Sequence, residues 1–484
     1  MTTPRPNPAR LPVYSALDEP QLAFSADQAE ERDPHPLRGL ARYGPYSRHA
    51  FAAYTPTIRV ATVGPAGGTG QVRQLLGSVR RAHAQQDRRN YVPAFPGFAE
   101  VFGADLVPAA DAAHMTWPDT LDDLPGDAAV DRVRRALGEM LRRLAAVRDQ
   151  FDLVSVHLPD AWAAGLRTDD FDAHNTMKVL GALAGIPTQV INDRTFTFPY
   201  RNSVAWRLSI AAYVKAGGVP WKLAPLPGVP DKTAYIGLAH ALRGDPQEAR
   251  FVTCCSQVFD ADGSGMQFIA YEAGDPVADG DEARRNPYLS RRDMRAVMLR
   301  SLHLYQGRNG GALPRRIVVF KQTAFRDDEL SGVDDAFTAV DEVECLEVNT
   351  NVAWRGVWLR SSRRADRRTE PDGYPVHRGV TVLTSGTSAL LWAAGDSPAV
   401  SLQGNHYYQG GKSIPRPLLI TRHAGAGPLE LAATETLAMT KMDWNNDALY
   451  DPIPVTITYA QRLARIIASD ASLRGDAFPY RMFM

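Results

Sequence analysis

The chain has few cysteines. Among its 484 residues there are three, Cys254, Cys255 and Cys345, and no pair has the CxxC spacing of a zinc site or a redox motif. A small, odd number also argues against the disulfide framework that small secreted domains use. We therefore expect buried free thiols, a reducing compartment and a cytoplasmic location.

Long apolar runs and a net charge are missing as well. No stretch approaches the roughly 18 consecutive apolar residues of a membrane-spanning helix, and the opening residues, MTTPRPNPARLP, lack the apolar core of a secretory signal. The 54 basic and 54 acidic residues balance. A nucleic-acid partner would therefore need basic surface that is gathered locally, and we expect no membrane association.

Strands and helices alternate in the first half of the chain. Short apolar runs rich in β-branched residues predict strands, and residues with helical periodicity lie between them. The strands are expected at 58–63, 151–159 and 186–192, and the helices from about 71, at 129–150, at 171–184 and at 202–223. Such alternation predicts an α/β fold with a parallel sheet.

The Pro-rich stretch APLPGVP, residues 224–230, separates this pattern from a different one. After it come successive strands with a tight turn at Asp262–Gly263, and then strands and helices in mixed order, which is the order of an RNase H-like domain. We predict an extended arm over 1–55, a Rossmann-like domain over 56–225 and an RNase H-like domain over 226–484.

The stretch HNTMKVLGALAGIPTQ, residues 174–189, gathers hydrogen-bond donors. His174 and Lys178 are four residues apart and share one helix face. Gln189 follows a Gly-Ile-Pro stop, and Lys215 lies in the last turn of the next predicted helix. A terminal phosphate needs several donors at once, so the four side chains predict an anion site. A solvated helix edge with a capping amide is the alternative for any one of them.

The spacing of these four residues resembles the 5′-phosphate pocket in the MID domain of prokaryotic Argonautes. Further stretches resemble the PIWI domain of that family and occur in the same order: CSQVFDADGSGM, GVTVLTSGTSALLW, LAMTKMDWNND and DPIPVTITYAQRLARI. The resemblance runs from about residue 20 to the C-terminus. It implies a Rossmann-like MID domain followed by an RNase H-like PIWI domain, and the chain length implies a short Argonaute without N-terminal and PAZ domains.

The resemblance also locates the positions where cleaving PIWI domains carry their metal ligands. These positions fall on Ala239, Gln322 and Gln461, none of which has a carboxylate or an imidazole. RNase H-like nucleases need such ligands to hold two Mg²⁺ ions at the scissile phosphate. The resemblance therefore implies binding of a guide–target duplex without cleavage. An active guide-directed endonuclease with a variant metal site is the alternative.

The resemblance further implies partners and a cofactor. Short Argonautes usually bind a guide RNA and a target DNA. They form a heterodimer with an APAZ-domain effector, which is a TIR, a sirtuin-like NADase or a nuclease. The resemblance implies that this heterodimer oligomerises on target binding and acts in antiviral defence by abortive infection. Mg²⁺ at the guide 5′-phosphate would be held by Gln189 and the C-terminal carboxylate of Met484. Arg355, Arg378 and Lys441 are candidate contacts to the nucleic-acid backbone.

One motif points to a different class of protein. VGPAGGTGQ, residues 63–71, is glycine-rich and follows a predicted strand, as in nucleotide-binding enzymes. It lacks the Gly-Lys-Ser/Thr of a P-loop and does not match GxGxxG. A turn and a helix start therefore explain the motif better than a nucleotide site does.

Overall fold

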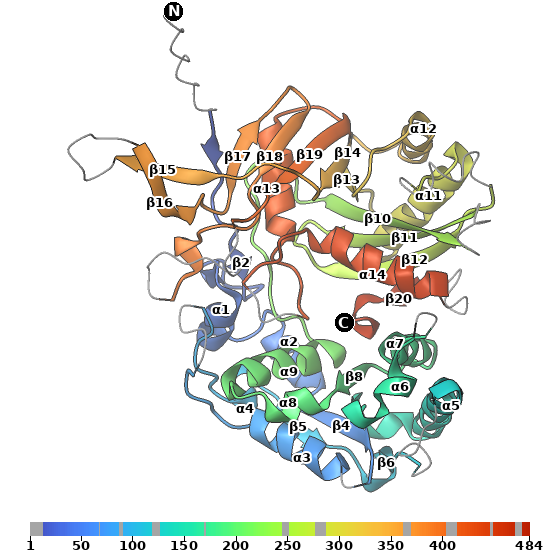
Figure 1. Ribbon diagram of the computed structural model, residues 1–484. Helices are drawn as coiled ribbons and strands as arrows, with labels where there is room; N and C mark the ends of the chain where they lie inside the picture. The colour runs from blue at the N-terminus through green and yellow to red at the C-terminus, as the bar shows by residue number, and fades with distance from the viewer. Residues whose placement is uncertain are drawn as a thin grey trace, which may run out of the picture.

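The computed structural model shows two α/β bodies with the C-terminus between them (Figure 1). We call residues 57–215 the lower body, and residues 233–484 together with strand β1 the upper body. The structure describes residues 13–66, 68–86, 91–118, 126–168, 171–243, 251–275, 287–361, 369–402, 414–445, 449–469 and 477–484.

The lower body is built on a parallel sheet with the strand order β5-β4-β7-β8, and β6 pairs with the second half of β4. Strands β4 and β7 are apolar along most of their length, as expected for strands that are covered on both faces. The strands are β4 Thr57–Gly64, β5 Asp105–Pro108, β6 His114–Thr116, β7 Leu153–His157 and β8 Thr188–Ile191.

Successive side chains of these strands point to opposite faces of the sheet. Val60 and Leu153 join the apolar cluster that contains helices α3 and α9, whereas Ala61 and Val154 join the cluster that contains α5 and α7. Helices thus cover both faces. They are α3 Gly68–Val79, α4 Phe98–Phe102, α5 Gly126–Ala145, α6 Ala163–Leu166, α7 Ala173–Leu183, α8 Asp193–Thr197 and α9 Arg201–Lys215.

The upper body contains a ten-stranded mixed sheet with the order β1-β17-β18-β19-β14-β13-β10-β11-β12-β20. Its first long strands form the predicted meander, and Gly263, with a φ of 71°, closes the turn between β11 and β12. The strands are β10 Thr233–Arg243, β11 Phe251–Asp260, β12 Gly265–Glu272, β13 Arg316–Lys321, β14 Glu342–Asn349, β17 Val380–Leu383, β18 Ser388–Leu391, β19 Leu418–Ala424 and β20 Ala477–Pro479, with a separate hairpin of β15 Val357–Ser361 and β16 Thr369–Pro375.

Helices cover this sheet on both faces as well. Ile236 of β10 packs in the cluster of α11 and α12, whereas Tyr235 packs in the cluster of α13 and Ala239 in that of α14. Gly237 lets α14 approach closely, because a Cβ at this position would lie 2.1 Å from the carbonyl oxygen of Thr456. The helices are α11 Arg291–Arg308, α12 Asp327–Ala336, α13 Leu429–Met439 and α14 Val455–Ser469.

The N-terminal region is more regular than the extended arm that the sequence suggested for residues 1–55. Helices α1 (Pro36–Tyr43) and α2 (Arg48–Tyr54) lie within it. Pro36 is in the first turn of α1, where its fixed φ suits a helix start, so proline content alone was a misleading sign of irregular structure. The remaining short strands are β1 Ser15–Ala16, β2 Leu22–Ala23, β3 Arg32–Asp33 and β9 Lys222–Leu223.

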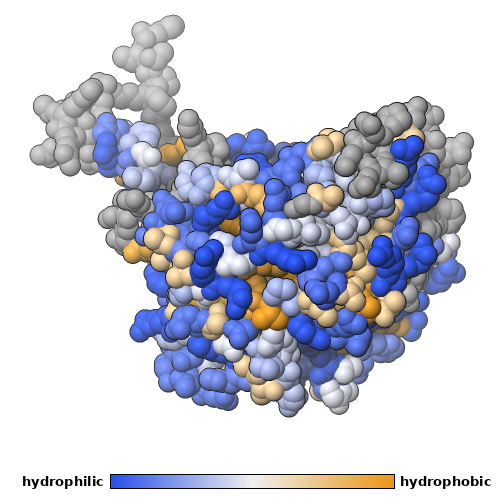
Figure 2. Space-filling model, turned by 90° about the horizontal axis from the view of Figure 1, so that it is seen from below, coloured by the Kyte–Doolittle hydropathy of each residue, from blue (hydrophilic) through white to orange (hydrophobic). Residues whose placement is uncertain are grey.

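The surface agrees with the balanced composition. Seen from below, from the side of the lower body, the molecule is mostly hydrophilic, with apolar patches near the middle (Figure 2). Within the described ranges, no helix combines the length and apolar character needed to cross a bilayer.

Candidate functional site

Three of the four predicted pocket residues are brought together by α7, β8 and α9. Lys178 Nζ donates a hydrogen bond to the carbonyl oxygen of Thr188, at 2.9 Å, and another to the main-chain oxygen of Met484. Lys215 Nζ donates to Oε1 of Gln189. The helix stop that precedes β8 makes this possible, because the chain reverses at Gly185, with a φ of 66°, and β8 then runs back beside α7.

The two lysines are buried, with 3% of Lys178 and 1% of Lys215 exposed. Burial disfavours an ammonium ion. It lowers the pKa of Lys178 to about 7. It also lowers the pKa of Lys215 well below the ordinary value for lysine, and the neighbouring Lys178 lowers that pKa further. Within the described part of the chain, neither lysine forms an ion pair with an aspartate or a glutamate. The C-terminal carboxylate of Met484 offers one negative charge to two buried lysines, so the arrangement suits an anionic ligand that supplies the rest.

The upper body adds positive charge to the same place. Arg462, exposed on α14, lies close enough to Lys178 to contribute to the lowering of its pKa. Nη1 of Arg481 lies 2.9 Å from the position that a Cβ on Gly217 would occupy, just beyond the end of α9. No sequence pattern indicated either arginine, although Arg462 directly follows Gln461.

His174 and Gln189 lie at the edge of this cluster. His174 is one helical turn before Lys178 on α7 and is exposed. Gln189 is half-buried and forms part of the wall of a surface cavity of about 440 Å³. Polar and aromatic side chains, including two arginines, share that wall: Asn192, Arg194, Thr195, Phe198, Ser203 and Arg207.

The oxygen atoms of this cluster partly fit a divalent cation. Oε1 of Gln189 and the main-chain oxygen of Met484 are hard donors of the kind that Mg²⁺ prefers, but each accepts a hydrogen bond from a lysine. No group of three or more His, Cys, Asp or Glu side chains suited to a metal ion occurs among the described residues. A cation here would need phosphate or water oxygens for its remaining ligands.

The three positions assigned to lost catalytic residues lie close together in the upper body. Leu238 on β10 is opposite Lys321, the last residue of β13, so Ala239 on β10 and Gln322, which directly follows β13, are neighbours. Gln461 on α14 donates from Nε2 to Oε1 of Gln322, and Gln322 Nε2 donates to Oγ1 of Thr350 at 3.1 Å. Neutral amides thus meet at the carboxyl end of the central strands.

The structure gives two of the three predicted backbone contacts another role. Arg355 is exposed, as a nucleic-acid contact would be. The side chains of Arg378 and Lys441 have no exposed surface, and both form ion pairs with Glu19. The prediction for these two residues was wrong, because cations that are buried and neutralised in this way do not reach a phosphate.

A parallel sheet that carries a lysine pocket, joined to an RNase H-like mixed sheet, is the MID–PIWI fold of Argonautes, and the predicted fold class is confirmed. In sequence the chain is similar to a Protein argonaute of Cereibacter sphaeroides, with 24% identity over 451 residues that cover 89% of this chain and 53% of that protein. No family model matches the sequence.

Solved Argonaute structures share the fold. One is Clostridium butyricum Argonaute bound to a guide DNA and a 19-mer target DNA, with a TM-score of 0.68, 15% identity and coverage of 98% of this chain and 55% of that chain. Another is Drosophila Piwi, with a TM-score of 0.59, 15% identity and coverage of 94% and 54%. The chain spans about half the length of these relatives. By its neighbours in sequence and in structure, it is Argonaute-like.

Proposed function

We propose that this chain binds a short guide strand by its 5′-phosphate and uses the guide, an RNA, to recognise complementary DNA. The observation that carries the proposal is the pair of buried lysines, Lys178 and Lys215, which lack an acidic side-chain partner among the described residues. The Clostridium butyricum relative, which holds a guide and a target, supports the assignment to nucleic acid.

A terminal phosphate suits this pocket better than an internal phosphodiester does. It carries close to two negative charges at neutral pH and three acceptor oxygens, and it can therefore satisfy both ammonium groups with charge-assisted hydrogen bonds. Base pairing would then select the target, while the protein holds the duplex by its shape and backbone. This division of labour requires no net positive charge on the protein.

We further propose that Mg²⁺ joins the guide phosphate in this pocket. Oε1 of Gln189 and the main-chain oxygen of Met484 would be its protein ligands, and the ion would reduce repulsion between the phosphate and nearby oxygens. The positions of the two oxygens support this proposal, because each accepts a hydrogen bond from one lysine of the pocket and both therefore lie in the same cluster.

The proposed chain recognises its target without cleaving it, and a partner supplies the response. The amides of Gln322 and Gln461, together with Ala239, would leave the PIWI site without the carboxylates that hold catalytic Mg²⁺. We propose that target binding activates an associated APAZ-containing effector, a TIR or sirtuin-like NADase or a nuclease, within a cytoplasmic complex that acts in prokaryotic immunity. The resemblance to short Argonautes supports this partner.

The affinity for matched guides tests the proposal. The purified chain should bind a 5′-phosphorylated guide RNA more tightly than the same RNA with a 5′-hydroxyl, and Lys178→Ala with Lys215→Ala should remove most of the difference. Lys232→Ala, at an exposed position, is the matched control. Equal affinity of the wild-type chain for both guides would show that the pocket does not read a terminal phosphate.

A further inference from the structure

We propose that Glu19 is a positioning residue for guide binding: through a strap, residues 13–35, it fixes the two bodies against each other so that their shared phosphate pocket forms. This inference rests on the proposed function, because it concerns the same pocket. It assigns a role to a carboxylate that lies in neither the pocket nor the lost nuclease site.

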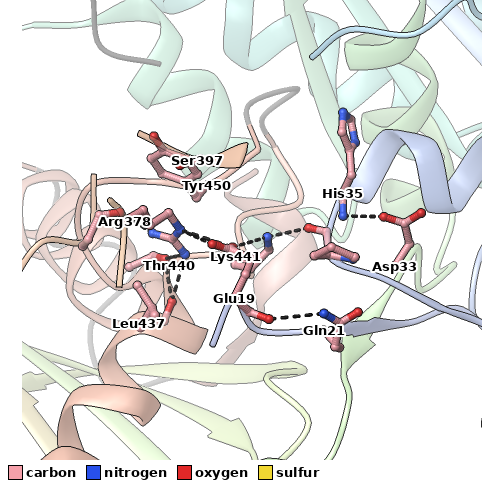
Figure 3. Close-up of polar contacts among 12 residues, drawn as sticks. Glu19, Gln21, Asp33, His35, Arg378, Ser397, Leu437, Thr440, Lys441 and Tyr450 are labelled. Carbon is pink, nitrogen blue, oxygen red and sulfur yellow. Dashed lines mark hydrogen bonds and ion pairs between the residues drawn. The ribbon is translucent and has the colours of Figure 1, made fainter. Parts of the chain in front are cut away.

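The strap is fastened to the upper body by a buried carboxylate between two buried cations (Figure 3). Glu19 accepts hydrogen bonds from Nε of Arg378, at 3.0 Å from Oε2, and from Nζ of Lys441, at 2.7 Å from Oε1. Neither cation has exposed side-chain surface, and that of Glu19 is 9% exposed. We call these three residues the clasp.

The other bonds of the two cations fix the clasp in place. Arg378 donates to Oγ1 of Thr440, at 2.8 Å, and its guanidinium lies 4.2 Å from the ring centroid of Tyr450. Lys441 Nζ also donates to the carbonyl oxygen of Pro34. The ammonium group of Lys441 therefore contacts the strap at two places, Glu19 and Pro34, which are 15 residues apart in the chain.

The same strap is fastened to the lower body next to Pro34. A ring nitrogen of His35 lies 2.7 Å from the carbonyl oxygen of Tyr91 in the lower body, and within the strap the backbone N–H of His35 donates to Asp33 at 2.7 Å. Strand β2 of the strap pairs with β9, which leads out of the lower body. The two bodies are thus joined by the strap in addition to the linker that follows β9.

The two bodies also pack directly, since α7 and α14 share an apolar cluster, and loss of Glu19 would weaken the connection that the strap adds. Removing Glu19 would leave two positive charges buried without a counter-ion, and breaking a buried pair in this way is strongly destabilising. Besides the clasp, the strap contacts the upper sheet through the two-residue pairing of β1 with β17 and through the backbone N–H of Leu17, which donates to the carbonyl oxygen of Gly379 at 3.0 Å. Without Glu19, the strap has no other ion pair to the upper body among the described residues.

The phosphate pocket depends on the position of the two bodies because each supplies part of it. Lys178 and Lys215 belong to the lower body, whereas Met484 and Arg462 come from the upper body. A change in the angle between the bodies would separate these groups without altering any one of them. Glu19 would in this way affect recognition of the phosphate from outside the pocket.

The test is Glu19→Gln, which keeps the shape of the side chain and removes its charge. We expect the affinity for a 5′-phosphorylated guide to fall by between about 5-fold and about 150-fold, the usual range of coupling between sites. The affinity for the 5′-hydroxyl guide should change little, because that guide makes no use of the two-body pocket. Proteolysis within the linker, residues 224–232, should become faster.

Two further variants separate positioning from general stability. Glu19→Asp keeps the charge and should retain most of the preference for the phosphorylated guide. Glu30→Gln, at an exposed position of the strap, should match the wild type. Equal losses for both guides, or no loss for either, would overturn the inference. A wild-type chain without any preference would overturn the proposed function first.

Discussion

At the scale of single residues, the buried pair Lys178 and Lys215 in the lower body should lower the stability of the folded chain. Lys178 and Lys215 are buried, burial lowers the pKa of both, Lys178 lowers that of Lys215 further, and neither has an acidic side-chain partner within the described ranges. Groups that destabilise a fold in this way are characteristic of functional sites. Their cost should be visible as a gain in stability when either one is replaced.

Lys215→Met should therefore stabilise the guide-free chain while it weakens guide binding. Replacing buried charge by an apolar side chain of similar size is often neutral or stabilising, by about 1–4 kcal/mol. Loss of a charge-assisted hydrogen bond costs about 1.5–3 kcal/mol, which corresponds to about 10-fold to 100-fold weaker binding of a 5′-phosphorylated guide. Denaturant unfolding and guide titration measure the two effects.

Lys222→Met is not a suitable comparison, because Lys222 is half-buried and pairs with Asp262 at 2.6 Å. Lys232→Met, at an exposed position, is the matched control and should leave both quantities unchanged. If Lys215→Met lowered the free energy of unfolding, the lysine would be a net contributor to the fold, and the argument for an anion site from its burial would fail.

Spacing in the sequence identified some residues of the site and gave no information on the burial of others. The four-residue step from His174 to Lys178 and the stop before Gln189 identified side chains that share one chain reversal. For Arg378 and Lys441 no local pattern could reveal burial, because their common partner Glu19 is 359 and 422 residues away in the chain. A cation in a loop looks the same in a sequence whether it faces solvent or a distant carboxylate.

At the scale of elements, β10 and α14 are in close backbone contact. Gly237 faces the backbone of Thr456, and a Cβ would lie 2.1 Å from its carbonyl oxygen. A backbone atom in a helix terminus cannot move aside as a flexible side chain can. Glycine is therefore required at this position for a close approach, although the position lies within a strand.

Gly237→Ala should destabilise the chain by about 1–3 kcal/mol or more, the usual cost of overpacking. The control is Gly307→Ala in α11, where nothing lies within 4 Å of the added Cβ and where alanine should stabilise the helix by up to about 1 kcal/mol. Denaturant unfolding distinguishes the two directions. A neutral Gly237→Ala would mean that α14 can shift away from β10 without cost.

The clasp gives the upper body a dependence on pH. Burial lowers the pKa of Lys441 to about 8, although Glu19 opposes this effect, whereas a lysine in an unfolded chain has a pKa near 10.4. Between these values the unfolded chain holds the proton and the folded chain does not. Unfolding therefore takes up a proton, and stability should rise with pH across this window.

Lys441→Met removes this titration. We compare the free energies of unfolding of the wild type and the variant. If the pKa of Lys441 is lowered, the wild-type value minus the variant value should be constant below about pH 7 and should rise between pH 8 and 10. Unfolding curves at pH 7, 9 and 10 measure the difference. A difference that falls with pH would mean that the pKa of Lys441 is raised by Glu19 and not lowered.

Sequence patterns predicted the long elements well and the short ones poorly. The apolar runs that became β4 and β7, and the periodic stretches that became α5 and α7, need no distant information to be recognised. Strands β1, β2, β3 and β9 have two residues each. Such short strands depend on partners far away in the chain, so no local pattern indicates them.

At the scale of the whole molecule, the proposed function predicts a stable complex in place of a reaction. With a 5′-phosphorylated guide RNA and a labelled complementary DNA, the chain should form a ternary complex in Mg²⁺ or Mn²⁺, and the DNA should remain intact. The physical reason is the amide pair Gln322–Gln461 beside Ala239, which provides no carboxylate for catalytic metal ions.

A guide lacking complementarity to the DNA is the control for specific binding. Cleavage at a fixed distance from the guide 5′-end, dependent on the metal, would contradict this prediction and would favour a nuclease with a variant metal site. Cleavage that persists without guide would instead indicate a contaminating enzyme and would leave the prediction standing after further purification.

The hydrogen-bonded amides of Gln322 and Gln461 have one more consequence for the proposed complex. The amides carry no net charge and therefore do not repel a phosphodiester, whereas carboxylates without a metal ion would push it away. A paired strand could then rest against this surface for as long as its base pairs hold. The residence time of the target, and with it the duration of any signal sent to an effector, would be set by the number of matched bases and by temperature.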